Sequence, residues 1–128
     1  MNEMNTLTER MAEIQSLAIV LLQDLQAAAQ RGILSFVVVE DMQSLMNNAK
    51  NGLTFLLENP DPTVTGWRHE IVGYLNAILG FSRMHGQRKF PESQALDEDH
   101  VRAFQQLEAL GRQALDGINA LVKATRES

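Results

Sequence analysis

The chain has 128 residues, of which 45% are hydrophobic, 5% aromatic and 21% charged, so we expect one globular domain, residues 1–128, with an aliphatic core. Because cysteine is absent, disulfides and thiolate metal sites are excluded, which favours a cytoplasmic location. The net charge of −5 without a basic stripe argues against nucleic-acid binding, and the apolar runs are too short to span a membrane.

Two helices are predicted in the N-terminal half. The first opens at Thr6, where Thr6 and Glu9 fit a capping box, and ends near Gly32. Its apolar residues alternate at spacings of four and three, a stripe typical of helical bundles: Leu7, Met11, Ile14, Ala18, Leu21, Leu25 and Ala28. The second runs from about Ser35 to Glu58. Residues 36–39 would also suit a strand, but the chain offers no second strand to pair with them.

The third helix is predicted to begin with Asp61 as its N-cap and Pro62 at its first position. It continues to about His85, which we interpret as a C-terminal histidine stabilised by the helix dipole. A polar loop follows over residues 87–96. The third helix should bury the rings of Trp67 and Tyr74 in the core.

The fourth predicted helix runs from about Asp97 to about Lys123, and His100 is expected on its surface. The fold class is therefore all-α, a bundle of about four helices. Residues 1–60 form an N-terminal hairpin and residues 61–128 a histidine-bearing hairpin. Apolar stripes on more than one helix predict a homodimer, and an intramolecular four-helix bundle is the alternative.

His69 lies on the polar side of the third predicted helix. At about 100° per residue, the apolar residues project to the side opposite His69: Trp67, Ile71, Tyr74, Leu75, Ile78, Phe81 and Ser82. His69 shares its own side with Gly73, Asn76 and Gly80. Because glycine weakens a helix, the repeat of Gly66, Gly73 and Gly80 suggests that another backbone approaches closely there. The simplest alternative is an ordinary solvated histidine.

The segment Arg68-His69-Glu70-Ile71, followed by Leu75-Asn76-Ala77-Ile78-Leu79-Gly80-Phe81-Ser82, resembles the phosphoacceptor box of sensor histidine kinases. The resemblance extends from Pro62 to about Lys123, because the fourth helix resembles the second helix of that family's hairpin. It implies that His69 is phosphorylated and that Glu70 orients its imidazole and accepts its proton. It also implies a partner-binding surface formed by Arg68, Gly73, Asn76 and Gly80.

The chain departs from the family at two points. Where the family has Arg-Thr-Pro, this chain has Val72-Gly73-Tyr74, so the proline that bends the helix is missing. Nothing in the sequence resembles the family's ATP-binding domain, so we expect neither autophosphorylation nor a cofactor. The three histidines, His69, His85 and His100, are too widely spaced to suggest a metal site.

These features predict a phosphotransfer module that receives phosphate from a partner kinase or a response-regulator receiver domain and passes it on through His69. Two alternatives are open. The chain could be a dimerisation or regulator-binding module that is not phosphorylated. It could also be the N-terminal part of a larger signalling enzyme.

Overall fold

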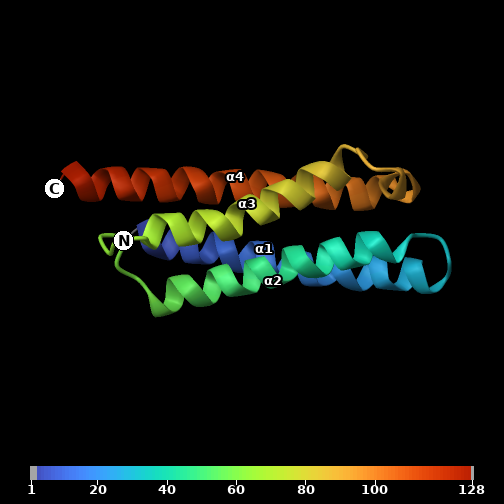
Figure 1. Ribbon diagram of the computed structural model, residues 1–128, viewed down its shortest axis with the longest axis horizontal. Coiled ribbons are helices and arrows are strands. Elements are labelled where there is room, and N and C mark those ends of the chain that lie inside the picture. The colour runs from blue at the N-terminus through green and yellow to red at the C-terminus, as the bar shows by residue number, and fades with distance from the viewer. Residues whose placement is uncertain (1–2, 128) are drawn as a thin grey trace.

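The computed structural model describes residues 3–127, and residues 1, 2 and 128 of the predicted domain lie outside the described part. Four long helices and a short 3₁₀-helix follow in the order α1 (Glu3–Gln30), α2 (Phe36–Glu58), α3 (Trp67–Gly86), η1 (Pro91–Ala95) and α4 (Glu98–Glu127). Residues 3–127 contain no strand, so the predicted all-α fold is confirmed. Figure 1 shows two helical hairpins, α1–α2 and α3–α4, lying side by side.

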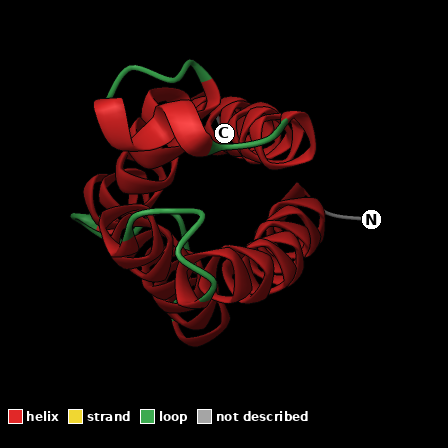
Figure 2. Ribbon diagram, turned by 90° about the vertical axis from the view of Figure 1, so that its right-hand side faces the viewer, coloured by secondary structure: helices red, strands yellow, loops and turns green. Residues whose placement is uncertain are grey.

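The four long helices close into one bundle around a shared core. Each helix packs against the next along the chain, and α4 packs back against α1. Figure 2 shows the four helices nearly end-on around this core. A single chain therefore completes the four-helix arrangement that was predicted as the alternative to a homodimer.

The predicted stripe of α1 faces this core. All of its members are at most 5% exposed: Leu7, Met11, Ile14, Ala18, Leu21, Leu25 and Ala28. The apolar surface that suggested a homodimer is thus covered within one chain. A homodimer remains a prediction, and it would have to use a different surface.

The start of α2 is helical, as predicted. The Ser35 hydroxyl oxygen accepts a hydrogen bond from the backbone N–H of Val37 at 3.1 Å, which caps the helix. Of the apolar run at residues 36–39, Val38 is fully buried, whereas Phe36 and Val37 are exposed. Helical spacing therefore places one member of the run in the core, where a buried strand would place alternate members there.

Two predicted helix starts are wrong. Because α1 already begins at Glu3, Thr6 does not cap it. The third helix begins at Trp67, not after Asp61, whose carboxylate instead accepts hydrogen bonds from the backbone N–H and hydroxyl of Thr63 at 3.0 and 2.6 Å. These bonds close a local turn. Gly66 then has φ +84°, a left-handed conformation that a right-handed helix cannot include.

The described helices contain no segment that is both long and apolar enough to cross a membrane.

Candidate functional site

His69 lies at the beginning of α3, on the side away from the core. Two neighbours fix the helix there: Trp67 is 2% exposed, and Ile71, one turn later, is fully buried. The indole N–H of Trp67 also donates to the backbone carbonyl of Asn59 at 2.6 Å, which ties the start of α3 to the end of α2. His69 is left exposed, as the helical projection predicted.

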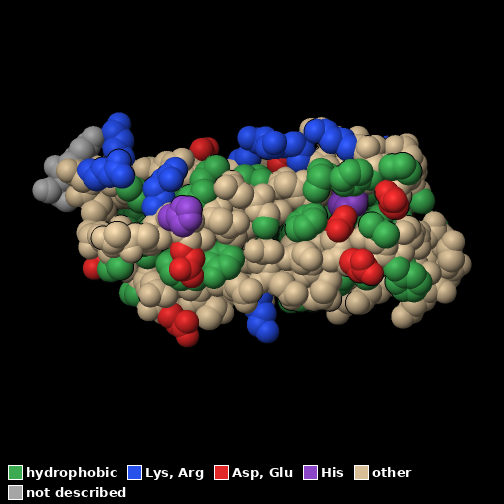
Figure 3. Space-filling model, viewed as in Figure 1, with side chains coloured by type: hydrophobic (Ala, Val, Ile, Leu, Met, Phe, Trp, Pro, Cys, Tyr) green, Lys and Arg blue, Asp and Glu red, His purple; other side chains and the backbone are tan. Residues whose placement is uncertain are grey.

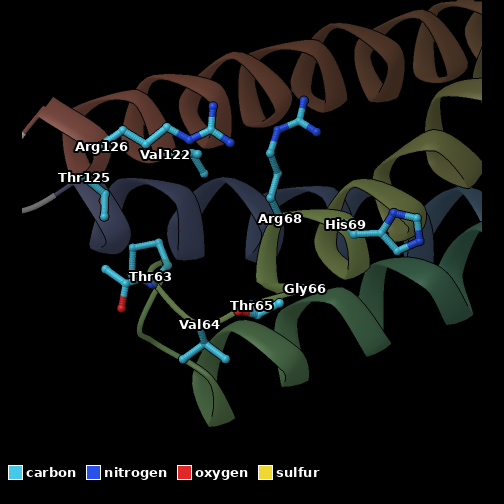
Figure 4. Close-up of a pocket in the computed structure, with 10 residues that line it drawn as sticks. Thr63, Val64, Thr65, Gly66, Arg68, His69, Val122, Thr125 and Arg126 are labelled. Carbon is cyan, nitrogen blue, oxygen red and sulfur yellow. The ribbon is translucent and has the colours of Figure 1, made fainter.

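A surface pocket of about 560 Å³ adjoins His69 (Figure 4). Its lining comes from the loop at residues 62–66, from Arg68 and His69 on α3, and from the last turns of α4 through Val122, Thr125 and Arg126. Sequence spacing could not predict the α4 residues, because only the packing of α4 against α3 brings them here.

Positive charge collects on the α4 side of this pocket. The Nε and Nη2 groups of Arg68 donate to the side-chain oxygen of Asn119 at 3.1 and 2.8 Å, so its partner is a neutral amide. Arg126 forms no ion pair with the side chains that the structure describes. In Figure 4 the Arg68 side chain extends from α3 toward α4, which carries Arg126, while the His69 ring points away from both arginines. In the left half of Figure 3, a histidine surface lies between basic side chains above and acidic ones below.

The predicted partner-binding positions along α3 form a surface that no other part of the bundle covers closely. Gly73 and Asn76 are exposed and Gly80 is half-buried. A Cβ atom added to Gly73 or Gly80 would meet no atom of another described element within 4 Å, so no described backbone outside α3 approaches them as closely as we expected. Gly66 does not belong to this surface, because its left-handed φ places it in the loop before α3.

Glu70 lies on a different side of α3 from His69. Its Oε2 atom accepts a hydrogen bond from the Tyr74 hydroxyl at 3.1 Å, and both residues line a shallow pocket of about 330 Å³ toward α2. No hydrogen bond joins Glu70 to His69 among the described residues. Consecutive helical positions do not face each other, so the contact implied by the family resemblance is not formed in this conformation.

His85 lies in the last turn of α3, as predicted, but packing and hydrogen bonds enclose its ring. It is fully buried between the rings of Phe104 and Phe90, at centroid distances of 5.3 and 6.0 Å. Its Nδ1 atom is 2.7 Å from the Ser93 hydroxyl oxygen, and its Nε2 atom is 2.8 Å from an Asp41 carboxylate oxygen. These contacts satisfy both ring nitrogens, so partners from α2 and η1, rather than the helix dipole, hold the imidazole.

The Ser93–His85–Asp41 cluster has the order of a hydrolase triad, but its serine is also 0% exposed. A substrate cannot reach that hydroxyl in this structure. The cluster therefore connects α2, α3 and η1 as an internal support. No local spacing in the sequence could reveal it, because Asp41 and His85 belong to different hairpins.

His100 is also more enclosed than expected, with 16% of its side chain exposed and its Nδ1 atom 3.5 Å from Asp97 Oδ1. The backbone N–H of His100 donates to the same carboxylate at 2.8 Å, so Asp97 caps the start of α4. Within the described residues, no group of three or more His, Cys, Asp or Glu side chains could hold a metal ion.

No protein-family model matches this sequence, and no curated protein or solved structure matches it either.

Proposed function

We propose that this chain is a histidine phosphotransfer module of a two-component signalling pathway, in which His69 accepts a phosphoryl group and passes it on. The supporting observation is the contrast among its three histidines, all of which lie in the described residues. His69 is exposed on an open helix face, whereas His85 is 0% exposed and only 16% of the His100 side chain is exposed. A phosphoacceptor must reach the phosphorus atom of a partner protein, and His69 can do so.

The proposed reaction is a nucleophilic displacement. The unprotonated ring nitrogen of His69 attacks the phosphorus of an aspartyl phosphate. An N–P bond forms, the P–O bond to the aspartate breaks, and the aspartate leaves as a carboxylate. The proton on the other ring nitrogen passes to a base, the role we propose for Glu70. The reverse displacement delivers the phosphoryl group to the next carboxylate.

The surroundings of His69 suit an acidic protein partner. Gly73 and Gly80 leave room for a loop of that partner to approach the helix. The charges of Arg68 and Arg126 on the α4 side would attract carboxylates and the phosphoryl group. We therefore propose the receiver domain of a response regulator, or a partner kinase, as the binding partner. A cytoplasmic location and a homodimer that uses a surface outside the bundle core belong to the same proposal.

One observation favours a second candidate function. The Glu70 carboxylate, the proposed base, already accepts a hydrogen bond from the Tyr74 hydroxyl. Tyr74 itself stands where the resembling family has proline. A module that binds a regulator without accepting phosphate would tolerate both features. The labelling experiment must therefore distinguish phosphotransfer from binding without phosphorylation.

The test uses purified chain and receiver domains carrying radioactive phosphate. We expect one label, stable in base and labile in acid, as for a phosphoramidate. His69→Ala should abolish the label, and His100→Ala, the matched control, should retain it. A receiver that binds wild type and His69→Ala equally well without labelling either would favour the second candidate.

A further inference from the structure

The geometry points to a further positioning residue, and the inference rests on the proposed function of His69. We propose that Tyr74 holds the Glu70 carboxylate on the α2 side of α3, so that the Glu70–Tyr74 hydrogen bond must open before Glu70 can act on the imidazole. The two residues are one helical turn apart, and the hydroxyl-to-carboxylate distance is 3.1 Å. Glu70 and His69 are consecutive, so their side chains project about 100° apart.

The Tyr74 side chain packs against α2. The Tyr74 ring lies 6.2 Å from the ring of Phe55, centroid to centroid, at an interplanar angle of 50°. On the same helix, Gly52 leaves space for the stem of Tyr74, whose Cβ would lie 3.4 Å from a Cβ at Gly52. The ring therefore packs on the α2 side of α3, where Tyr74 lines the same pocket as Glu70. The tyrosine therefore draws Glu70 toward α2.

The electrostatics keep Tyr74 a donor. Desolvation, followed by the hydrogen bond and negative charge of Glu70, raises the pKa of the Tyr74 hydroxyl above its ordinary value of 10.0. The phenol therefore stays protonated throughout the neutral range. An ionised Glu70 offers it a charged acceptor, which makes a stronger hydrogen bond than a neutral one.

This hydrogen bond arises from a departure of this chain from the family it resembles. Position 74 corresponds to the proline of the phosphoacceptor box, and a proline side chain has no donor. With tyrosine there, the carboxylate has two possible partners, the phenol and the imidazole. Removing the phenol hydroxyl should leave Glu70 free for His69.

Tyr74→Phe is the decisive variant, because it keeps the ring and removes only the hydroxyl. Potassium phosphoramidate serves as the phosphoryl donor: its P–N bond breaks, ammonia leaves, and a new N–P bond forms on the imidazole. We use a His100→Ala background, so that the label reports His69. Tyr74→Phe should be labelled roughly three- to tenfold faster than its parent, as expected for losing one competing hydrogen bond at an exposed position.

Two controls separate positioning from a general structural effect. In a Glu70→Gln background, Tyr74→Phe should produce no acceleration, because the carboxylate that it frees is gone. Gln43→Ala removes another side-chain hydrogen bond between residues four apart, the 3.1 Å bond to Asn47 on α2, and should leave the rate unchanged.

A second readout does not depend on phosphorylation. Tyr74 is the sole tyrosine of the chain, so phenolate absorbance titrates it alone. Its midpoint should lie above 10.0 in the wild type and move down in Glu70→Gln. Equal labelling rates for Tyr74→Phe and its parent, or a midpoint unaffected by Glu70→Gln, would overturn the inference. If both readouts behave as expected but no receiver labels His69, the proposed function fails and the role of Tyr74 stands.

Discussion

Replacing His85 with alanine should destabilise the bundle far more than the same change at His69. The His85 ring is fully buried and packs between Phe90 and Phe104, so its loss leaves a cavity among aromatic rings. Replacing a large buried side chain with alanine costs about 2–5 kcal/mol. His69 is exposed and has no such contacts, so its replacement should change stability by no more than about 0.5 kcal/mol.

Hydrogen bonding adds to the expected loss. Without His85, the Ser93 hydroxyl, which is 0% exposed, loses its partner, and leaving such a group unsatisfied costs about 1–3 kcal/mol. Asp41 adds less, because 26% of its side chain is exposed and water can replace the imidazole. Since these contributions are not additive, we expect about 3–5 kcal/mol in total, a large share of the ~5–15 kcal/mol that stabilises an ordinary domain.

Urea denaturation measures this difference directly. Trp67 is the sole tryptophan and is 2% exposed, so its fluorescence reports the opening of the core. Ser93→Ala, which removes one partner but retains the ring, should cost about 1 kcal/mol. If His85→Ala loses less than about 1 kcal/mol, the Ser93–His85–Asp41 cluster does not support the fold as we argue.

Three further predictions follow from the sequence and the bundle. Purified chain incubated with labelled ATP alone should acquire no label, since no nucleotide site is recognisable in its sequence, and label on His69 would refute this. Because the core closes within one chain, the helix content at about 25 °C, measured by circular dichroism, should be the same at about 1 and about 100 µM protein, whether or not the folded chain dimerises; a loss of helix on dilution would show that folding depends on a dimer. Burial alone would raise the pKa of Glu108, but hydrogen bonds and charges from Arg112 and Arg83 lower that pKa below 4.5. The stability lost in Glu108→Gln should therefore be constant at neutral pH and disappear as the pH falls below about 4.5. A loss of stability that persists in acid would contradict this prediction.

The buried face of each helix could be predicted because it depends on local spacing. On α3, Trp67, Ile71 and Leu75 are buried as expected, and His69 lies opposite them. Tyr74, whose ring was also expected in the core, is only half-buried. The cap of α2 at Ser35 could be predicted for the same reason, since its hydroxyl bonds a backbone N–H two residues later. Helical periodicity and capping act over one or two turns, a range that a sequence displays directly.

The predictions that failed concern features that depend on contacts between distant segments or on backbone conformation. His85 looks like an ordinary residue near a helix end, and only its packing against Asp41 and Ser93 reveals its role. Asp61 followed by proline fits a helix start, but the left-handed Gly66 interrupts the segment. At the site, the exposure of His69 was predictable, whereas Arg126 reaches the same pocket only because α4 packs beside α3.

The bond from the Trp67 indole to Asn59 has a consequence for the entropy of docking. It fixes the backbone beneath His69 before any partner arrives, because it joins the loop between α2 and α3 to the first turn of α3. A docking protein would then need to immobilise little more than the two side-chain torsions of the imidazole. Ordering one side chain costs about 0.5–1.5 kcal/mol, much less than folding a loop. Association should therefore resemble the docking of rigid surfaces, with a rate set by diffusion and charge.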